Sequence, residues 1–258
     1  MHLILRRLDD LAAHLGARDD TVAVLGLGSA GAQRARLDEH SDLDFLLVVA
    51  DGAKWRYVDR TDWLEVPGPV VFSFAHERDG RRALYEDGVL AEYRVVTVAE
   101  LTKVPFSGAR IVWRRTGAPP GLAESQASLP HTPYDSADYH LNDALTCLYT
   151  GMHRELRGER LAASRMIQTR AVDGVIALAR LSGGEPPYRD PFDASRRVER
   201  AYPPDALPLA AMVPGYTGNA AAALAILDWL AHRYPIDPAI GDPVRALIRR
   251  SAQTPHAR

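Results

Sequence analysis

The stretch Val22–Val49, VAVLGLGSAGAQRARLDEHSDLDFLLVV, decides the fold of this chain. It begins with a short apolar run, Val22–Leu27, and ends with a second one, Phe45–Val49. Short apolar runs bounded by turn residues are typical of buried strands. Gly28 and Ser29 end the first run. The stretch therefore predicts two buried strands joined by a polar loop or a short helix.

Two aspartates, Asp42 and Asp44, stand at the start of the second run. Because side chains alternate along a strand, residues two apart point to the same face. Adjacent carboxylates repel each other unless a positive group lies between them, and Mg²⁺ prefers such oxygen ligands. We therefore expect Asp42 and Asp44 to hold Mg²⁺. For an isolated Asp-x-Asp pattern, two solvated carboxylates paired with nearby arginines would be the better interpretation.

Gly28 and Ser29 fit a phosphate group. A glycine lets the backbone approach a ligand closely, and the free N–H groups at the start of a following helix favour an anion. Ser29 could also cap that helix, and capping and phosphate binding use the same geometry. Phosphates and a carboxylate-held Mg²⁺ a few residues apart indicate a site for a nucleoside triphosphate.

These motifs carry a resemblance to a known family. Gly28-Ser29, followed after 12 residues by Asp42-Leu43-Asp44-Phe45, resembles the signature of the polymerase-β-like nucleotidyltransferases. The segment Tyr85–Val95, YEDGVLAEYRV, is similar to the strand that bears the third carboxylate of the family, which falls on Glu92. The segment Leu156–Glu159 and the helical pattern after it are similar to the helical half of the lincosamide nucleotidyltransferases.

The resemblance implies a Mg²⁺-dependent adenylyltransferase. It would transfer a nucleotidyl group, in the first place AMP from ATP, to a hydroxyl of a small acceptor and release pyrophosphate. Asp42, Asp44 and Glu92 would form the metal and catalytic site, with Glu92 as general base or as a further metal ligand. Gly28 and Ser29 would bind the β- and γ-phosphates. The implied acceptor is an antibiotic of the lincosamide or aminoglycoside type, which points to antibiotic resistance or self-protection.

A dinucleotide-binding fingerprint competes with this interpretation. Gly26–Gly31 reads as G-x-G-x-x-G after a predicted strand, and Asp51 follows the second apolar run. This is the pattern of a Rossmann NAD(P)-binding oxidoreductase. A Rossmann fold, however, needs an amphipathic helix between the two strands, and residues 32–44 offer few apolar positions. We therefore rank this alternative below the nucleotidyltransferase.

Two further alternatives concern the role of the site. A toxin–antitoxin nucleotidyltransferase would modify a protein or tRNA, but such chains are usually shorter and more basic. A nucleotide-binding regulator without catalysis would not need all three carboxylates. Glu92 itself could be a surface ion-pair partner of Arg94, two residues further along the same strand.

Composition sets the expected partners. With 31 basic and 33 acidic residues, the net charge of −2 does not favour a stable complex with nucleic acid or a membrane surface. A single cysteine, Cys147, fits a reducing compartment and predicts a small buried side chain. The N-terminus resembles no signal peptide, and no apolar run approaches a membrane span. We expect a cytoplasmic enzyme with an NTP and a small acceptor as its partners, and a homodimer is compatible with the sequence.

The chain divides into two predicted domains. Residues 1–125 predict the NTP- and Mg²⁺-binding domain, a mixed sheet with helices, and residues 126–258 predict an all-helical substrate-binding domain. The fold class is therefore α+β, of the nucleotidyltransferase type. Besides the two strands above, periodicity predicts strands over 70–74, 89–98 and 110–113, a polar loop over 76–82, and helices over 3–16, 136–157, 159–182, 217–233 and 242–252.

Overall fold

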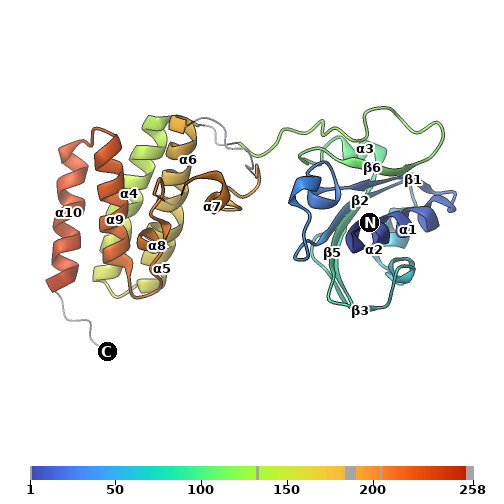
Figure 1. Ribbon diagram of the computed structural model, residues 1–258, viewed down its shortest axis with the longest axis horizontal. Coiled ribbons are helices and arrows are strands. Elements are labelled where there is room, and N and C mark those ends of the chain that lie inside the picture. The colour runs from blue at the N-terminus through green and yellow to red at the C-terminus, as the bar shows by residue number, and fades with distance from the viewer. Residues whose placement is uncertain (1, 132–133, 184–189, 204, 254–258) are drawn as a thin grey trace. The chain divides into compact units, whose positions relative to one another are not determined.

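The computed structural model describes residues 2–131, 134–183, 190–203 and 205–253 (Figure 1). Its contacts divide the chain into two compact units, Met1–Pro130 and His131–Arg258. The boundary predicted from the sequence lies a few residues earlier, after residue 125. The first unit is built around a sheet, and the described part of the second is helical (Figure 1).

The sheet of the first unit has six strands in the order β3-β4-β5-β2-β1-β6. Strands β2 and β5 run parallel, and every other neighbouring pair in the sheet is antiparallel. The sheet is thus mixed, and the α+β fold class is confirmed. The strands are β1 (Thr21–Gly26), β2 (Leu43–Val49), β3 (Val70–Ala75), β4 (Gly80–Tyr85), β5 (Leu90–Thr97) and β6 (Arg110–Arg114).

The helices of the first unit are short except for the first. Helix α1 (Leu3–Gly16) has the bounds that its period predicts, and its apolar stripe, which includes Leu8 and Leu11, is buried. The remaining helical segments are α2 (Lys54–Val58), α3 (Val98–Leu101) and the 3₁₀ turns η1 (Gly28–Ala30), η2 (Arg34–Arg36) and η3 (Asp62–Glu65).

The central strand β2 contributes to a separate apolar core on each face of the sheet. Phe45 and Leu47 belong to the larger core, which includes α1, whereas Leu46 and Val48 belong to the smaller one. All four are essentially inaccessible to solvent, and burying each stabilises the fold by roughly 1.5–3 kcal/mol. Asp44 lies on the face of Leu46 and Val48 because it precedes them at spacings of two. The polar site therefore lies at the edge of the smaller core.

The prediction of a polar loop over 76–82 was wrong in its last part, because β4 begins at Gly80. Two arginines, Arg81 and Arg82, hid this strand from the apolar pattern. Arg82 donates a hydrogen bond to Glu92 on β5, and Arg81 donates to Ser73 on β3. Neighbouring strands thus supply the partners that make charged residues acceptable here, and a hydropathy pattern does not reveal such partners.

The described part of the second unit contains helices and no strand, so the all-helical prediction is confirmed. The helices are α4 (Ala137–Leu156), α5 (Arg160–Ser164), the π-helical turn η4 (Arg165–Ala171), α6 (Val172–Gly183), α7 (Val198–Ala201), α8 (Leu209–Met212), α9 (Asn219–Arg233) and α10 (Pro238–Gln253). No helix in the described ranges is both long enough and apolar enough to cross a membrane.

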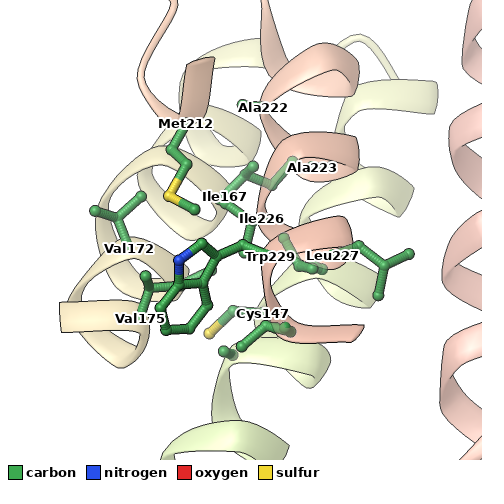
Figure 2. Close-up of a cluster of buried hydrophobic side chains, with 14 of the residues drawn as sticks. Cys147, Ile167, Val172, Val175, Met212, Ala222, Ala223, Ile226, Leu227 and Trp229 are labelled. Carbon is green, nitrogen blue, oxygen red and sulfur yellow. The ribbon is translucent and has the colours of Figure 1, made fainter. Parts of the chain in front are cut away.

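The helices of this unit share one apolar core (Figure 2). The indole of Trp229 packs among Val172, Val175 and Met212, and its Nε1 donates a 2.9 Å hydrogen bond to the carbonyl oxygen of Ala206 (Figure 2). Cys147 is buried, as predicted, and burial raises the pKa of its thiol. The cysteine therefore acts as a small apolar residue of the core.

The segment predicted as one helix over 159–182 contains a π-helical turn, η4, between α5 and α6. Gln168 in this turn donates to the carbonyl oxygen of Gly215 at 2.8 Å and to Asn219 at 2.6 Å. Asn219 in turn donates to Glu155 on α4 at 2.7 Å. The local widening of the helix accompanies this buried polar network, which links three helical segments.

Candidate active site

The parallel pairing of β2 with β5 places Asp44 directly opposite Glu92. The next pairing, β5 with β4, places Glu92 directly opposite Arg82. Residues opposite each other on neighbouring strands lie on the same face of a sheet. Asp44, Glu92 and Arg82 therefore form one row across three strands, which we call the carboxylate row.

The third acidic residue, Asp42, completes this cluster. It stands immediately before β2, two residues from Asp44, and both side chains are half-buried. The guanidinium of Arg82 interacts with all three acidic residues. Its Nε donates a 2.8 Å hydrogen bond to Glu92, which raises the pKa of Arg82, and the charges of Asp42 and Asp44 raise it further. The three predicted carboxylates thus act on one cation.

Glu92 does have an ion-pair partner, but the partner differs from the one considered from the sequence. The sequence alternative paired Glu92 with Arg94, whereas in the structure Arg94 pairs with Glu77, and Arg82 pairs with Glu92. Both Glu92 and Arg82 remain more than one third exposed. Solvent-exposed ion pairs of this kind contribute little to stability, so the pair does not by itself explain why a carboxylate occupies this position.

The Gly28 turn lies against Asp44. The backbone N–H of Leu27 donates a 2.8 Å hydrogen bond to the Asp44 carbonyl oxygen, and Gly28 has a φ of 51°. A Cβ atom on Gly28 would lie 3.2 Å from the Asp44 Oδ2 atom. Glycine is required here for its left-handed backbone and for the close approach of the carboxylate. Ser29 follows Gly28 within the 3₁₀ turn η1 and is thus next in the chain to the residue that lies against Asp44.

The other two glycines of the stretch have a packing role. A Cβ atom on Gly31 would lie 2.5 Å from the Gly26 carbonyl oxygen, so the turn is folded tightly onto itself. Strands β1 and β2 are antiparallel and are joined by 3₁₀ turns, whereas a Rossmann fold joins parallel strands through an α-helix. The dinucleotide-binding alternative is therefore wrong, and the glycine pattern reflects the compact turn.

Two arginines of the site escaped sequence analysis. Arg82 was placed in a loop, and Arg110 at the start of β6 gave no motif. Arg110 donates from Nε to the Ala30 carbonyl oxygen and from Nη1 to Asp9 on α1, both at 3.1 Å. It thus ties the η1 turn to the first helix. Only the long-range pairing of β6 with β1 reveals this contact.

The donor set can be tested against Mg²⁺. No three His, Cys, Asp or Glu side chains within the described ranges converge into a ready metal cage. Mg²⁺, however, is commonly held by one or two carboxylates together with substrate phosphates and water. Asp42 and Asp44 supply two such carboxylates, and their field already acts on the Arg82 cation. These residues fit Mg²⁺ that is bound jointly with a triphosphate.

No protein-family model matches the sequence, and no curated protein matches it significantly. Solved structures of low similarity exist. An aminoglycoside 6-adenyltransferase from Bacillus subtilis is 12% identical over 97% of this chain and 99% of its own, with a TM-score of 0.32. A nucleotidyltransferase-like protein from Exiguobacterium sibiricum is 12% identical over 95% and 80%, with a TM-score of 0.33.

A third similar structure is the CD-NTase CdnG from Bradyrhizobium diazoefficiens in complex with GTP, which is 13% identical over 97% of this chain and 98% of its own, with a TM-score of 0.24.

Proposed function

We propose that this protein is a Mg²⁺-dependent nucleotidyltransferase that transfers AMP from ATP to a hydroxyl group of a small acceptor. One observation carries the proposal: Asp44 lies opposite Glu92 in the sheet and in contact range of the Gly28 turn. The backbone that we propose binds phosphate, the carboxylates that we propose bind metal and the proposed base thus lie near one another at one end of the sheet. This combination is what phosphoryl-transfer chemistry requires.

The proposed reaction assigns a task to each group. The acceptor oxygen attacks the α-phosphorus of ATP, the new O–P bond forms, and the bond from that phosphorus to the oxygen bridging to the β-phosphate breaks, releasing pyrophosphate. Glu92 accepts the proton of the acceptor hydroxyl. Backbone N–H groups at Gly28 and Ser29 bind the β- and γ-phosphates. Mg²⁺ held by Asp42 and Asp44 would neutralise phosphate charge.

The proposed acceptor is an antibiotic of the lincosamide or aminoglycoside type, as the sequence resemblance implies. Both classes carry sugar hydroxyl groups that a nearby carboxylate base can deprotonate. Glu92 is suited to that task because it is only partly buried and its partner Arg82 is also accessible to solvent. An incoming hydroxyl can therefore reach the carboxylate without rearrangement of the strand.

The test is a transfer assay. The protein is incubated with labelled ATP and Mg²⁺ against a panel of lincosamides and aminoglycosides, and mass spectrometry detects an acceptor with AMP added and an equal amount of pyrophosphate. Melting temperatures are measured in parallel, since a ligand that binds only the native state raises them. Mg-ATP should stabilise the protein, and NAD or NADP should not.

Asp44→Asn is the control variant. It replaces a charged ligand by a neutral one of the same shape, so the fold should persist while transfer and stabilisation by Mg-ATP are lost. Transfer at the wild-type rate in this variant contradicts the metal assignment. Labelled protein or tRNA in place of a labelled antibiotic identifies the toxin–antitoxin alternative.

A further inference from the structure

Arg110 connects the Gly28 turn to the first helix and to the edge of the sheet. It is the first residue of β6 and pairs with Gly26, the last residue of β1, so it stands where the chain leaves the sheet for the turn. Its Nε donates to the Ala30 carbonyl oxygen and its Nη1 to Asp9 on α1, both at 3.1 Å. One guanidinium therefore fixes the turn to two other elements.

The part of the turn that this arginine holds is enclosed. Ala30 is 1% exposed, and a Cβ atom on Gly26 would lie 2.6 Å from the Ala30 carbonyl oxygen. This oxygen thus lies close to the backbone of β1 and accepts a hydrogen bond from Arg110. An enclosed carbonyl oxygen that loses its donor is unfavourable. Without the arginine, the turn therefore has to shift until water or another donor reaches the oxygen.

Stability alone is a poor explanation for an arginine at this position. The third guanidinium nitrogen of Arg110, Nη2, is buried and has no hydrogen-bond partner within the described ranges. A buried N–H without a partner destabilises a fold. The ion pair with Asp9 offsets little of this, because the Asp9 side chain is 38% exposed and solvent screens it. What the arginine does supply is geometry, since its planar fork holds one donor toward the turn and another toward α1.

We infer that Arg110 is a positioning residue of the proposed nucleotide site. Through its hydrogen bond to Ala30, it holds the backbone N–H groups of Gly28 and Ser29 in the orientation that binds the β- and γ-phosphates. This inference rests on the proposed function and extends its site to β6 and α1. Neither hydrogen bond of Arg110 involves the carboxylate row, so the arginine acts on the binding of Mg-ATP and not on the chemical step.

Arg115, which directly follows β6, provides a matched control. Its Nε donates to the Thr21 carbonyl oxygen at 2.8 Å, and its Nη2 donates to the carbonyl oxygen of Arg18. Like Arg110, it is half-buried and holds backbone carbonyl oxygens of a neighbouring segment. Thr21, however, is the first residue of β1, about 16 Å along the strand from the Gly28 turn. Loss of Arg115 should therefore lower stability without changing the turn.

The first measurement concerns the turn itself, without any nucleotide. The backbone N–H groups of Gly31 and Gln33 both donate to the Gly28 carbonyl oxygen, so their hydrogen exchange, followed by NMR, measures how often the turn opens. Arg110→Gln should accelerate exchange of these two amides about tenfold, the effect of losing one hydrogen bond from a charged donor. Arg115→Gln should leave their exchange at the wild-type rate.

The second measurement is the calorimetric titration of Mg-ATP into the same proteins, with kinetics of AMP transfer in parallel. Arg110→Gln should weaken Mg-ATP about tenfold while kcat at saturating ATP changes little, and Arg115→Gln should bind Mg-ATP as the wild type does. Arg110→Lys keeps the charge but replaces the fork by one ammonium group, so its affinity should stay close to that of Arg110→Gln. Wild-type affinity in Arg110→Lys would mean that charge and not geometry matters, which overturns the positioning role.

The outcomes separate this inference from the proposed function. Faster exchange and weaker Mg-ATP binding in Arg110→Gln, without AMP transfer to any acceptor, support the inference and contradict the transferase. AMP transfer with a Mg-ATP affinity that Arg110→Gln leaves unchanged contradicts the inference alone. Unchanged exchange, or equal effects of Arg110→Gln and Arg115→Gln, also overturns it, and a wild type that binds no Mg-ATP overturns both proposals. If Arg110→Gln does not fold, Asp9→Ala on the surface of α1 releases the same guanidinium and should weaken Mg-ATP about two- to fivefold.

Discussion

Asp44 and Glu92 face each other across the one parallel strand pair of the sheet, β2 and β5. Their strands are ~4.8 Å apart, a spacing at which two carboxylates repel unless a cation balances them. Arg82 supplies that balance through its 2.8 Å hydrogen bond to Glu92. The carboxylate row therefore already has one cation beside it, the guanidinium of Arg82.

The first prediction concerns Glu92→Gln. If Glu92 is the general base, kcat for nucleotidyl transfer should fall by roughly 10²–10⁴-fold, because a positioned base contributes about that factor. The ATP affinity should change little, since the Gly28 turn and the aspartates remain. Steady-state kinetics and calorimetric titration with Mg-ATP measure the two quantities separately.

Glu77→Gln is the control for that variant. Glu77 also forms an ion pair, with Arg94, and its side chain is 43% exposed compared with 41% for Glu92. It lies outside the carboxylate row, so its loss should leave kcat unchanged. Equal kcat values for the two variants would show that Glu92 is only a surface ion-pair partner.

The second prediction concerns Arg82→Gln. This variant removes the cation that the three carboxylates share, so a divalent cation should meet less competition at Asp42 and Asp44. The affinity for Mn²⁺, measured by calorimetry without nucleotide, should rise roughly two- to fivefold, the range expected for an exposed ion pair. A weaker Mn²⁺ affinity would mean that Arg82 helps to build the site and does not compete with the metal.

The third prediction compares Gly28→Ala with Gly52→Ala. Both glycines have a positive φ, 51° and 83°, so alanine costs about 1–2 kcal/mol of backbone strain at either position. Only at Gly28 would the new Cβ lie against the Asp44 carboxylate, at 3.2 Å, whereas the surroundings of Gly52 are open. Chemical denaturation should show similar losses of stability. Titration with Mg-ATP should show weaker binding for Gly28→Ala alone. Equal ATP affinities of the two variants would show that the Gly28 turn does not bind the nucleotide.

The fourth prediction concerns pH. Arg7 donates to both carboxylate oxygens of Asp87, at 3.1 and 2.7 Å, and this hydrogen bonding lowers the pKa of Asp87 below its ordinary 3.8. A carboxyl whose folded-state pKa is lowered contributes stability above its unfolded pKa and loses it as the pH falls through the folded value. Asp87→Asn should therefore be less stable than the wild type at pH 7, and the difference should vanish well below pH 3.8.

The expected difference at pH 7 is about 1 kcal/mol, because solvent screens the 42% exposed Asp87 side chain although Arg7 itself is buried. Denaturation at a series of pH values measures it. Asp62→Asn is the control, since Asp62 pairs with Arg60 and both side chains are more than half exposed. A difference for Asp87→Asn that persists unchanged at low pH would show that the effect does not arise from ionisation.

Local patterns predicted most of the fold. The apolar period predicted helix α1, and a run of five apolar residues predicted β2. Both predictions succeeded because the apolar residues of each element are buried in a core. Strand β4 was missed because Arg81 and Arg82 are stabilised by partners on other strands. A local pattern contains no information about such partners.

The candidate site divides in the same way. The spacing of the motifs predicted the site residues Asp42, Asp44, Glu92, Gly28 and Ser29. Their catalytic and binding roles stay predictions. The register that sets Glu92 opposite Asp44 and Arg82 opposite Glu92 depends on how distant strands pair. The contact of Arg110 with the Ala30 carbonyl oxygen depends on the same long-range pairing. Residue types thus led to a hypothesis about the chemistry, whereas the arrangement of these residues could not be predicted from them.

The parallel pairing of β2 with β5 also has a consequence for how the chain folds. Residues 50–89 lie between the two strands, so the pairing closes a long loop and must overcome its entropy before it is stabilised by contacts. Hairpins such as β3-β4 can form early from local contacts alone. Asp44 and Glu92 come together only when this non-local pair forms, and a partly folded intermediate without the pair would lack the carboxylate row.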